Sequence, residues 1–161
     1  MMSSPGIPAV IDTNIFIEHQ RPDYVDWPTI VGEQPVRLVV PLRVVEEVDA
    51  MKYQGHERTR RVAREILPWL EAVLKDGTDP QNVRLNTTIE VQLQGAPRYR
   101  PMDADEEILD VYEDIRLLAG RARLITADCS MRIRARAMGF EVSVMPETYR
   151  RQRPSSAGPA G

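Results

Sequence analysis

The sequence is poor in the side chains that form cross-links and soft metal sites. Its 161 residues include one cysteine, Cys129, and two histidines, His19 and His56. A single cysteine forms no internal disulfide, which fits a reducing compartment, and these three residues are too few for the common zinc sites. Any metal would therefore be held by oxygen ligands, which favours Mg²⁺ or Mn²⁺.

Long apolar runs are also absent. No stretch of about eighteen apolar residues occurs, so no transmembrane helix is expected. The first residues, MMSSPGIPAV, do not show the basic region followed by an apolar core that is typical of a secretory signal. We therefore expect a cytoplasmic protein without a membrane partner.

Lysine is scarce among the basic residues. Of the 21 basic residues only Lys52 and Lys75 are lysine, and all others are arginine. Arginine binds phosphate through a planar, bidentate fork, which suits nucleic acid, although a GC-rich genome explains such a bias at least as well. Because the net charge is −3, there is no global attraction to nucleic acid, and the positions of individual arginines matter more than their number.

Short apolar runs alternate with helical patterns along most of the chain. Strands are predicted at residues 8–11, 36–40, 123–126 and 141–144, and helices at 42–53, 56–75, 103–119 and 128–138. A helical segment also begins near Thr13, with interruptions near Pro22 and Pro28. Pro68 is expected to kink or restart the helix that contains it. The alternation over residues 82–93 indicates strand or hairpin structure.

This order of elements predicts an α/β fold with three layers, α/β/α, around a central and mainly parallel sheet. The length suits one domain, which we place at residues 1–149. Residues 150–161 are rich in Pro, Ser, Gly and Ala, so we expect a disordered tail.

Four acidic residues share one position relative to the predicted elements. Asp12 follows the first strand, Glu47 lies in the helix after the second, Asp105 lies in the first turn of its helix, and Asp128 follows the strand at 123–126. Helices that begin at the same edge of a parallel sheet bring their first turns together. Four unpaired carboxylates repel one another, and a divalent metal relieves that repulsion. Each acid alone is explained as well by a helix cap or helix start, but their common placement favours a metal site.

At this point the sequence resembles a known family. The stretches IDTN, VPLRVVEEVDAMK, DADEEILD and ITADCSMRIRA together resemble the PIN-domain nucleases, in the right order over roughly residues 7–145. The form of the second stretch is most similar to the branch found beside PhoH-type ATPases and in RNA-decay nucleases. The short toxins of toxin–antitoxin pairs look less similar.

The resemblance implies an acidic quartet that binds magnesium or manganese and cleaves single-stranded RNA. The matching acids are Asp12, Glu47, Asp105 and Asp128. By this match Asp12, Asp105 and Asp128 would hold the metal, and Glu47 would hold the metal or its water. Glu47 is preferred to its neighbour Glu46 by register against the family.

Three further residues match positions around the quartet in the family. Asn14 and Thr126 match polar residues that support the site, and Arg132 matches a basic position expected to contact RNA phosphate. Ser130 stands where many relatives have Asp or Asn, so we expect a fifth ligand to be missing, which would weaken a second metal site. Residues 77–101 match no part of the family pattern.

Several alternatives remain open at this point. An RNA-binding PIN-like module without activity would share the fold, and a ribonuclease toxin would share the site and add an antitoxin as partner. Many relatives form homodimers, so a homodimer is open as well. A phosphatase of the haloacid dehalogenase type ranks low, because it requires an Asp where this chain has Asn14.

Overall fold

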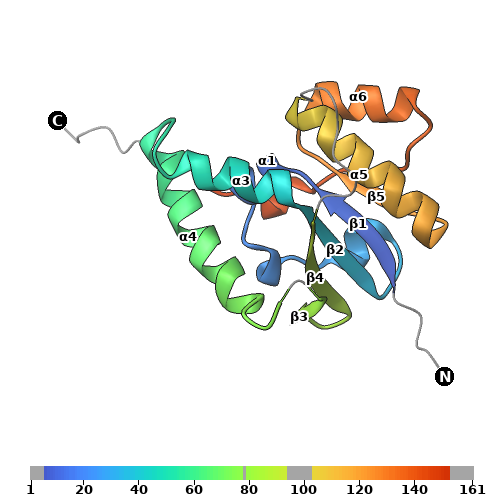
Figure 1. Ribbon diagram of the computed structural model, residues 1–161, viewed down its shortest axis with the longest axis horizontal. Helices are drawn as coiled ribbons and strands as arrows, with labels where there is room; N and C mark the ends of the chain where they lie inside the picture. Colours follow the sequence, from blue (N-terminus) through green and yellow to red (C-terminus); the bar gives the residue numbers. More distant parts are fainter. Residues whose placement is uncertain (1–5, 78, 94–102, 153–161) are drawn as a thin grey trace.

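A twisted sheet forms the centre of the protein (Figure 1). The computed structural model describes residues 6–77, 79–93 and 103–152. Within them the strand order is β3-β4-β2-β1-β5-β6. The strands are β1 (Ile7–Ile11), β2 (Val36–Pro41), β3 (Gln81–Arg84), β4 (Thr87–Gln92), β5 (Arg123–Ile125) and β6 (Val142–Ser143). All neighbours pair in parallel except β3, which is antiparallel to β4. The predicted mainly parallel sheet and the predicted hairpin are both confirmed.

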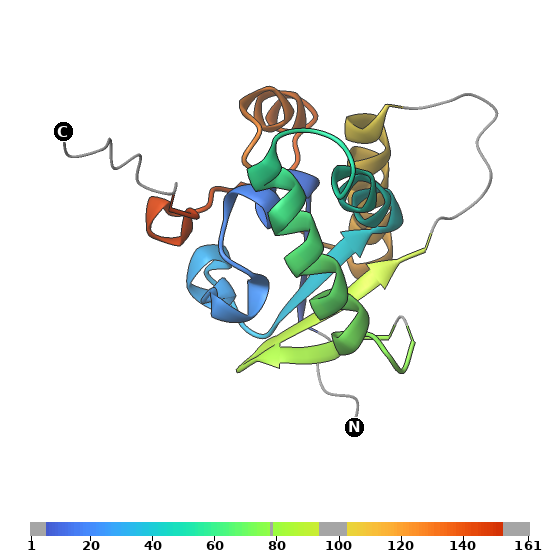
Figure 2. The same ribbon diagram turned by 90° about the vertical axis from the view of Figure 1, so that its left-hand side faces the viewer.

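Helices lie on both faces of this sheet. Figure 2 shows α5, in yellow, on one side of β2 and β4, and η1 with α2, in light blue, on the other. The helical elements are α1 (Thr13–Glu18), η1 (Pro22–Tyr24), α2 (Trp27–Val31), α3 (Leu42–Met51), α4 (Glu57–Val73), α5 (Ala104–Ala119), α6 (Cys129–Ala137) and η2 (Glu147–Tyr149). The arrangement is the α/β/α architecture expected from the alternation of elements.

The central strand β1 contains a proline, which cannot donate a hydrogen bond to a neighbouring strand. The Asp12 N–H donates to Ile125 O of β5 at 3.4 Å, and by alternation the nitrogen of Pro8 faces the same side. The pairing of β1 with β5 starts only at Ala9, opposite Arg123. Pro8 therefore lies just before the paired region, where its missing N–H leaves no partner unsatisfied.

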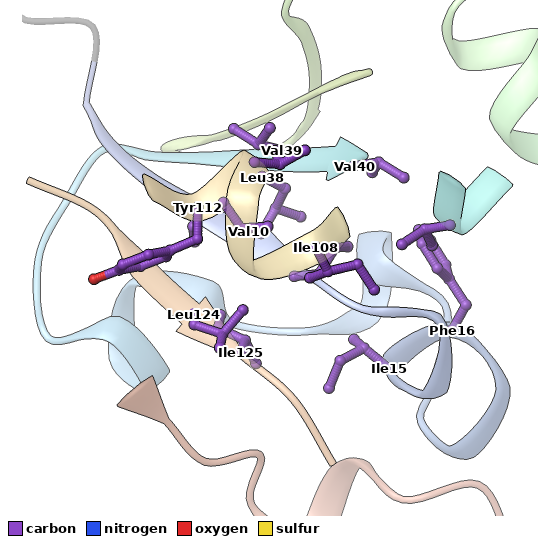
Figure 3. Close-up of a cluster of buried hydrophobic side chains, with 14 of the residues drawn as sticks. Val10, Ile15, Phe16, Leu38, Val39, Val40, Ile108, Tyr112, Leu124 and Ile125 are labelled. Carbon is purple, nitrogen blue, oxygen red and sulfur yellow. The ribbon is translucent and has the colours of Figure 1, made fainter. Parts of the chain in front are cut away.

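The core lies between β1, β2, β5 and helix α5 (Figure 3). Val10, Leu38 and Leu124 of the sheet are fully buried, as is Tyr112 of α5. The Tyr112 hydroxyl donates to Ala122 O and accepts from the Glu141 N–H, both at 3.0 Å. The ring thus fills the core, while its hydroxyl connects α5 to the residues that directly precede β5 and β6.

The strand order reverses at β1. From β1 the chain adds β2 and then β4 on one side, and after α5 it places β5 on the other side of β1. In open α/β sheets, ligands bind at such a switch point, beyond the carboxyl ends of the strands. Here those ends are followed directly by Asp12 after β1 and by Thr126 after β5.

Two local predictions differ from the structure. Of the kink or restart predicted at Pro68, the restart does not occur, because helix α4 continues through the proline as one element. Ile66 and Leu70 on either side of the proline are buried, and this burial offsets the cost of the proline, about 3 kcal/mol.

The first residues of the tail predicted at 150–161 are also held in the structure. Arg150 forms a β-bridge with His19, and Arg151 donates its N–H to Glu18 O at 2.9 Å. These backbone bonds hold both residues on the domain. Residues 153–161 lie outside the described part, as do residues 78 and 94–101 of the unmatched stretch. Within the described part, no helix has the length and apolar character needed to cross a membrane.

Candidate active site

Asp12 is the most buried of the four acids. It follows β1 directly and caps α1, with its Oδ1 accepting from the Ile15 N–H at 3.3 Å. Only 4% of its surface is exposed. Its pKa is raised from 3.8 to about 6. Burial is the largest cause, hydrogen bonds from Thr126 and Ile15 lower the pKa, and the negative charges of Asp128 and Asp105 raise it.

Thr126 connects two of the acids at the ends of β1 and β5. Its hydroxyl donates to Asp12 Oδ2 and accepts from the Asp128 N–H at 3.0 Å. Asp128 caps α6, because its Oδ1 accepts from Ser130 N at 2.9 Å and from Met131 N at 3.4 Å. One fully buried hydroxyl thus fixes the spacing of both carboxylate-bearing residues.

Glu47 approaches from the second turn of α3. Its Oε1 accepts from the Thr13 hydroxyl at 2.9 Å. Burial raises its pKa, Thr13 and Arg43 lower it, and Asp105 and Glu107 raise it. The neighbouring Glu46 is exposed to solvent, so the side chain selected by register is the one that turns inward.

Asp105 lies in the first turn of α5. Burial raises its pKa, the charges of Asp128 and Asp103 raise it further, and Arg134 lowers it. The cap of this helix is Asp103, which accepts from Glu106 N at 2.7 Å. Asp105 is therefore free of the capping role that its neighbour fulfils.

The four predicted acids are thus brought to one end of the sheet, where their charges affect one another. Asp105 acts electrostatically on both Asp12 and Glu47, and Asp128 acts on Asp12 and Asp105. The donor set consists of oxygen atoms only, which fits a hard divalent cation. Within the described ranges, however, no three Asp, Glu, His or Cys side chains stand close enough together to hold one ion. The four carboxylates therefore lie at the same end of the sheet but are not arranged as the ligands of one ion.

The PIN domain family matches residues 9–145, which include all four acids and every strand of the sheet except the first two residues of β1. The chain belongs to the PIN domain family. PIN domains are generally nucleases, and a divalent metal is their general cofactor.

A solved structure gives a second comparison. It is described as a domain of a functionally unknown protein from Methanocaldococcus jannaschii DSM 2661, and it is 17% identical with a TM-score of 0.54. The similarity covers 92% of this chain and 97% of that one, and at this identity it shows the fold alone. Curated protein sequences contain no match.

A cleft of about 430 Å³ lies beside the acids of the PIN domain. The predicted supporting residues Asn14 and Thr126 both line it, and so does Arg132. One guanidinium nitrogen of Arg132 donates to Thr126 O at 3.2 Å. The cleft therefore adjoins Asp12 through Thr126, and the predicted phosphate-binding arginine faces it.

Sequence reasoning missed two contributions to this region of the PIN domain. Thr13, which binds Glu47, lies inside the D-T-N stretch, but nothing local indicates that its hydroxyl reaches a residue 34 positions away. The residues after Met145 also line the cleft, through Glu147 and Arg150. Their composition gives no sign of this, because backbone hydrogen bonds hold them in place.

Proposed function

We propose that the protein is a divalent-metal-dependent endoribonuclease that hydrolyses phosphodiester bonds of single-stranded RNA. The observation that carries the proposal is Asp12, a buried carboxylate at the switch point of the sheet whose pKa is raised by burial and by two further acids. An arrangement that disfavours negative charge in this way costs stability. Such a cost is typical of a site that binds a cation.

Each acid has a distinct role in this proposal. Asp12, Asp105 and Asp128 would hold Mg²⁺ or Mn²⁺, and Glu47 would hold the metal or its water. Because no three acids of the described residues stand close enough together to hold one ion, these side chains would have to turn toward a common point to do so. When bound, the metal lowers the pKa of a water molecule and offsets charge on the leaving oxygen. No side chain acts as a covalent nucleophile.

The surrounding polar side chains orient the acids. Thr126 fixes both acids, because its hydroxyl donates to the Asp12 carboxylate and accepts from the Asp128 N–H, and Thr13 holds Glu47 in its inward position. Such supporting hydrogen bonds commonly change metal affinity or activity by about 10–100-fold. Arg132 binds a phosphate of the RNA from the adjoining cleft. A homodimer and an antitoxin partner remain predictions from family resemblance.

The test is cleavage of a labelled single-stranded RNA in Mg²⁺, in Mn²⁺ and in EDTA. Wild-type protein should cleave only with metal, and Asp12→Asn should lose activity by more than about 100-fold, as active-site carboxylates do. Asparagine is a good helix cap, so the variant retains the start of α1. Asp114→Asn, an exposed acid on α5, is the matched control and should keep full activity.

Two results would contradict the proposal. Cleavage that persists in EDTA would exclude the metal-dependent mechanism. Wild-type protein that binds RNA but cleaves none across varied sequences, with no metal bound in a titration, would favour the inactive RNA-binding module.

A further inference from the structure

The cleft beside the acids has two walls of different origin. The inner wall comes from the acid-bearing segments, with Asn14, Thr126 and Arg132. The outer wall contains Glu18 of α1 and, from the end of the described chain, Glu147 and Arg150. With a volume of about 430 Å³, the cleft falls in the range of pockets that enclose small ligands, roughly 300–1,000 Å³.

The outer wall depends on a segment that we name the C-terminal strap, residues 146–152. The Gln20 N–H donates to Tyr149 O at 2.8 Å, and the Arg151 N–H donates to Glu18 O at 2.9 Å. Arg58 of α4 donates to Arg151 O at 3.3 Å, and the Arg151 guanidinium pairs with Glu65 at 3.1 Å. The strap lies beyond residue 145, where the family match ends.

Charge differs between the two walls. On the inner wall, Arg132 makes no ion pair with any carboxylate of the described residues, so its charge is available to an anion. On the outer wall, Arg150 lies between two carboxylates, at 3.8 Å from Glu18 and 3.6 Å from Glu147. The outer wall thus carries donors and acceptors without an excess of positive charge, which suits a neutral group with hydrogen-bonding edges better than a second phosphate.

We propose that the cleft binds one nucleotide of the RNA next to the scissile phosphate, with its phosphate at Arg132 and its base against the strap. Arg150 and Glu147 then determine which base is accepted at that position. This inference rests on the proposed ribonuclease function. It follows from one cleft that contains an arginine without a carboxylate partner among the described residues, a wall of mixed charge, and Thr126, which binds Asp12.

The hydrogen-bonding groups of the outer wall are complementary to those of a nucleic-acid base. Carboxylates accept hydrogen bonds from the ring N–H and amino groups of a base, and a guanidinium donates to its carbonyl or ring nitrogen. RNA-binding proteins recognise unpaired bases through hydrogen bonds of this kind to the edges of the bases. A base preference would therefore arise from residues that take no part in bond cleavage.

The experiment compares wild type with Arg150→Ala and Glu147→Gln in two assays. The first maps cleavage positions in a randomised single-stranded RNA in Mg²⁺. The second measures binding of AMP, GMP, CMP and UMP to each protein in EDTA. Glu147 is largely exposed and the strap is held by other atoms, so Glu147→Gln should fold normally. Thermal unfolding checks that Arg150→Ala does too.

We expect wild type to prefer one base beside the cut and to bind that nucleoside monophosphate best. Each variant should weaken that preference by roughly tenfold, the effect of losing one charge-assisted hydrogen bond. Arg136→Ala, an exposed arginine of α6 outside the cleft, should leave it unchanged. Unaltered preference and unaltered nucleotide binding in both variants would overturn the inference.

The two proposals fail separately. If wild type cleaves RNA with metal but the strap variants behave as wild type, the inference fails and the ribonuclease function stands. If wild type cleaves nothing but binds one nucleotide through Arg150 and Glu147, the nucleotide site stands and the ribonuclease function fails.

Discussion

Asp12 has two roles that oppose each other at the scale of a single residue. As a cap and hydrogen-bond acceptor it begins α1 and joins β1 to β5 through Thr126. As a buried carboxylate close to two others it is more stable when protonated, with a pKa of about 6 in the folded state. The same side chain therefore organises the fold and destabilises it once it is ionised.

This conflict gives a pH-dependent stability in metal-free protein. Because the folded-state pKa lies above the usual aspartate value of 3.8, the stability that Asp12 contributes is fully present below pH 3.8 and is lost as pH rises through about 6. The loss across this window is about 3 kcal/mol, at 1.36 kcal/mol per unit of pKa. The Asp12→Asn variant should not show this loss of stability with rising pH.

Urea unfolding in EDTA between pH 4 and 8 measures the effect. The variant should become more stable than wild type as pH rises, and the two curves should converge near pH 4. A wild-type advantage at pH 8 would show that the hydrogen bonds of the carboxylate outweigh its repulsion from Asp105 and Asp128.

Glu47 and Glu46 allow a comparison of adjacent residues with identical chemistry. Glu47 is half-buried and bound by Thr13, whereas Glu46 is exposed. We expect Glu47→Gln to lower metal-dependent RNA cleavage by at least about tenfold and Glu46→Gln to leave it unchanged. Initial rates at several Mg²⁺ concentrations test this, and equal effects of the two substitutions would remove Glu47 from the site.

At the scale of elements, the position of α5 depends on Tyr112. Its hydroxyl bonds to the residues that directly precede β5 and β6, Ala122 and Glu141, and α5 in turn carries Asp105. Tyr112→Phe keeps the buried ring but leaves Ala122 O and the Glu141 N–H without that partner. We expect a loss of about 1–3 kcal/mol in the free energy of unfolding, measured by urea denaturation, with RNA cleavage by the folded variant largely retained.

Most elements followed from local patterns in the sequence. The buried run before Asp12 gave β1, and the alternation around Ile89 gave the hairpin, because period-two burial is a local signal. The continuity of α4 did not follow, because the burial of Ile66 and Leu70 overrides the local effect of Pro68.

The candidate site, like the fold, was predictable where it depends on local features of the sequence. Capping residues after strands mark Asp12 and Asp128, since caps are a local property of the chain. The strap was not predictable, because its bonds join residues near 20 to residues near 150 through backbone atoms whose partners no side chain specifies.

At the scale of the whole molecule, the reversal of strand order at β1 gathers acids from four separate segments. None of these segments forms the site alone, so a cation bound there would join distant parts of the chain and stabilise the native state. We expect Mg²⁺ at 100 times its dissociation constant to raise the free energy of unfolding by about 2.7 kcal/mol.

Thermal unfolding with and without Mg²⁺ measures this effect without any substrate. Wild type and Asp114→Asn should gain stability alike, and Asp12→Asn and Asp128→Asn should gain little. Equal gains in all four proteins would indicate binding of magnesium elsewhere.

The β3–β4 hairpin points the opposite way from the acids. Its tip, at Leu85 and Asn86, precedes β4, whereas the acids follow the carboxyl ends of strands parallel to β4. Leu85 is 84% exposed. A thiol introduced at residue 85, in a chain whose exposed Cys129 is replaced by serine, would give a single attachment point. A molecule tethered there to a surface would present its acidic edge to the solution.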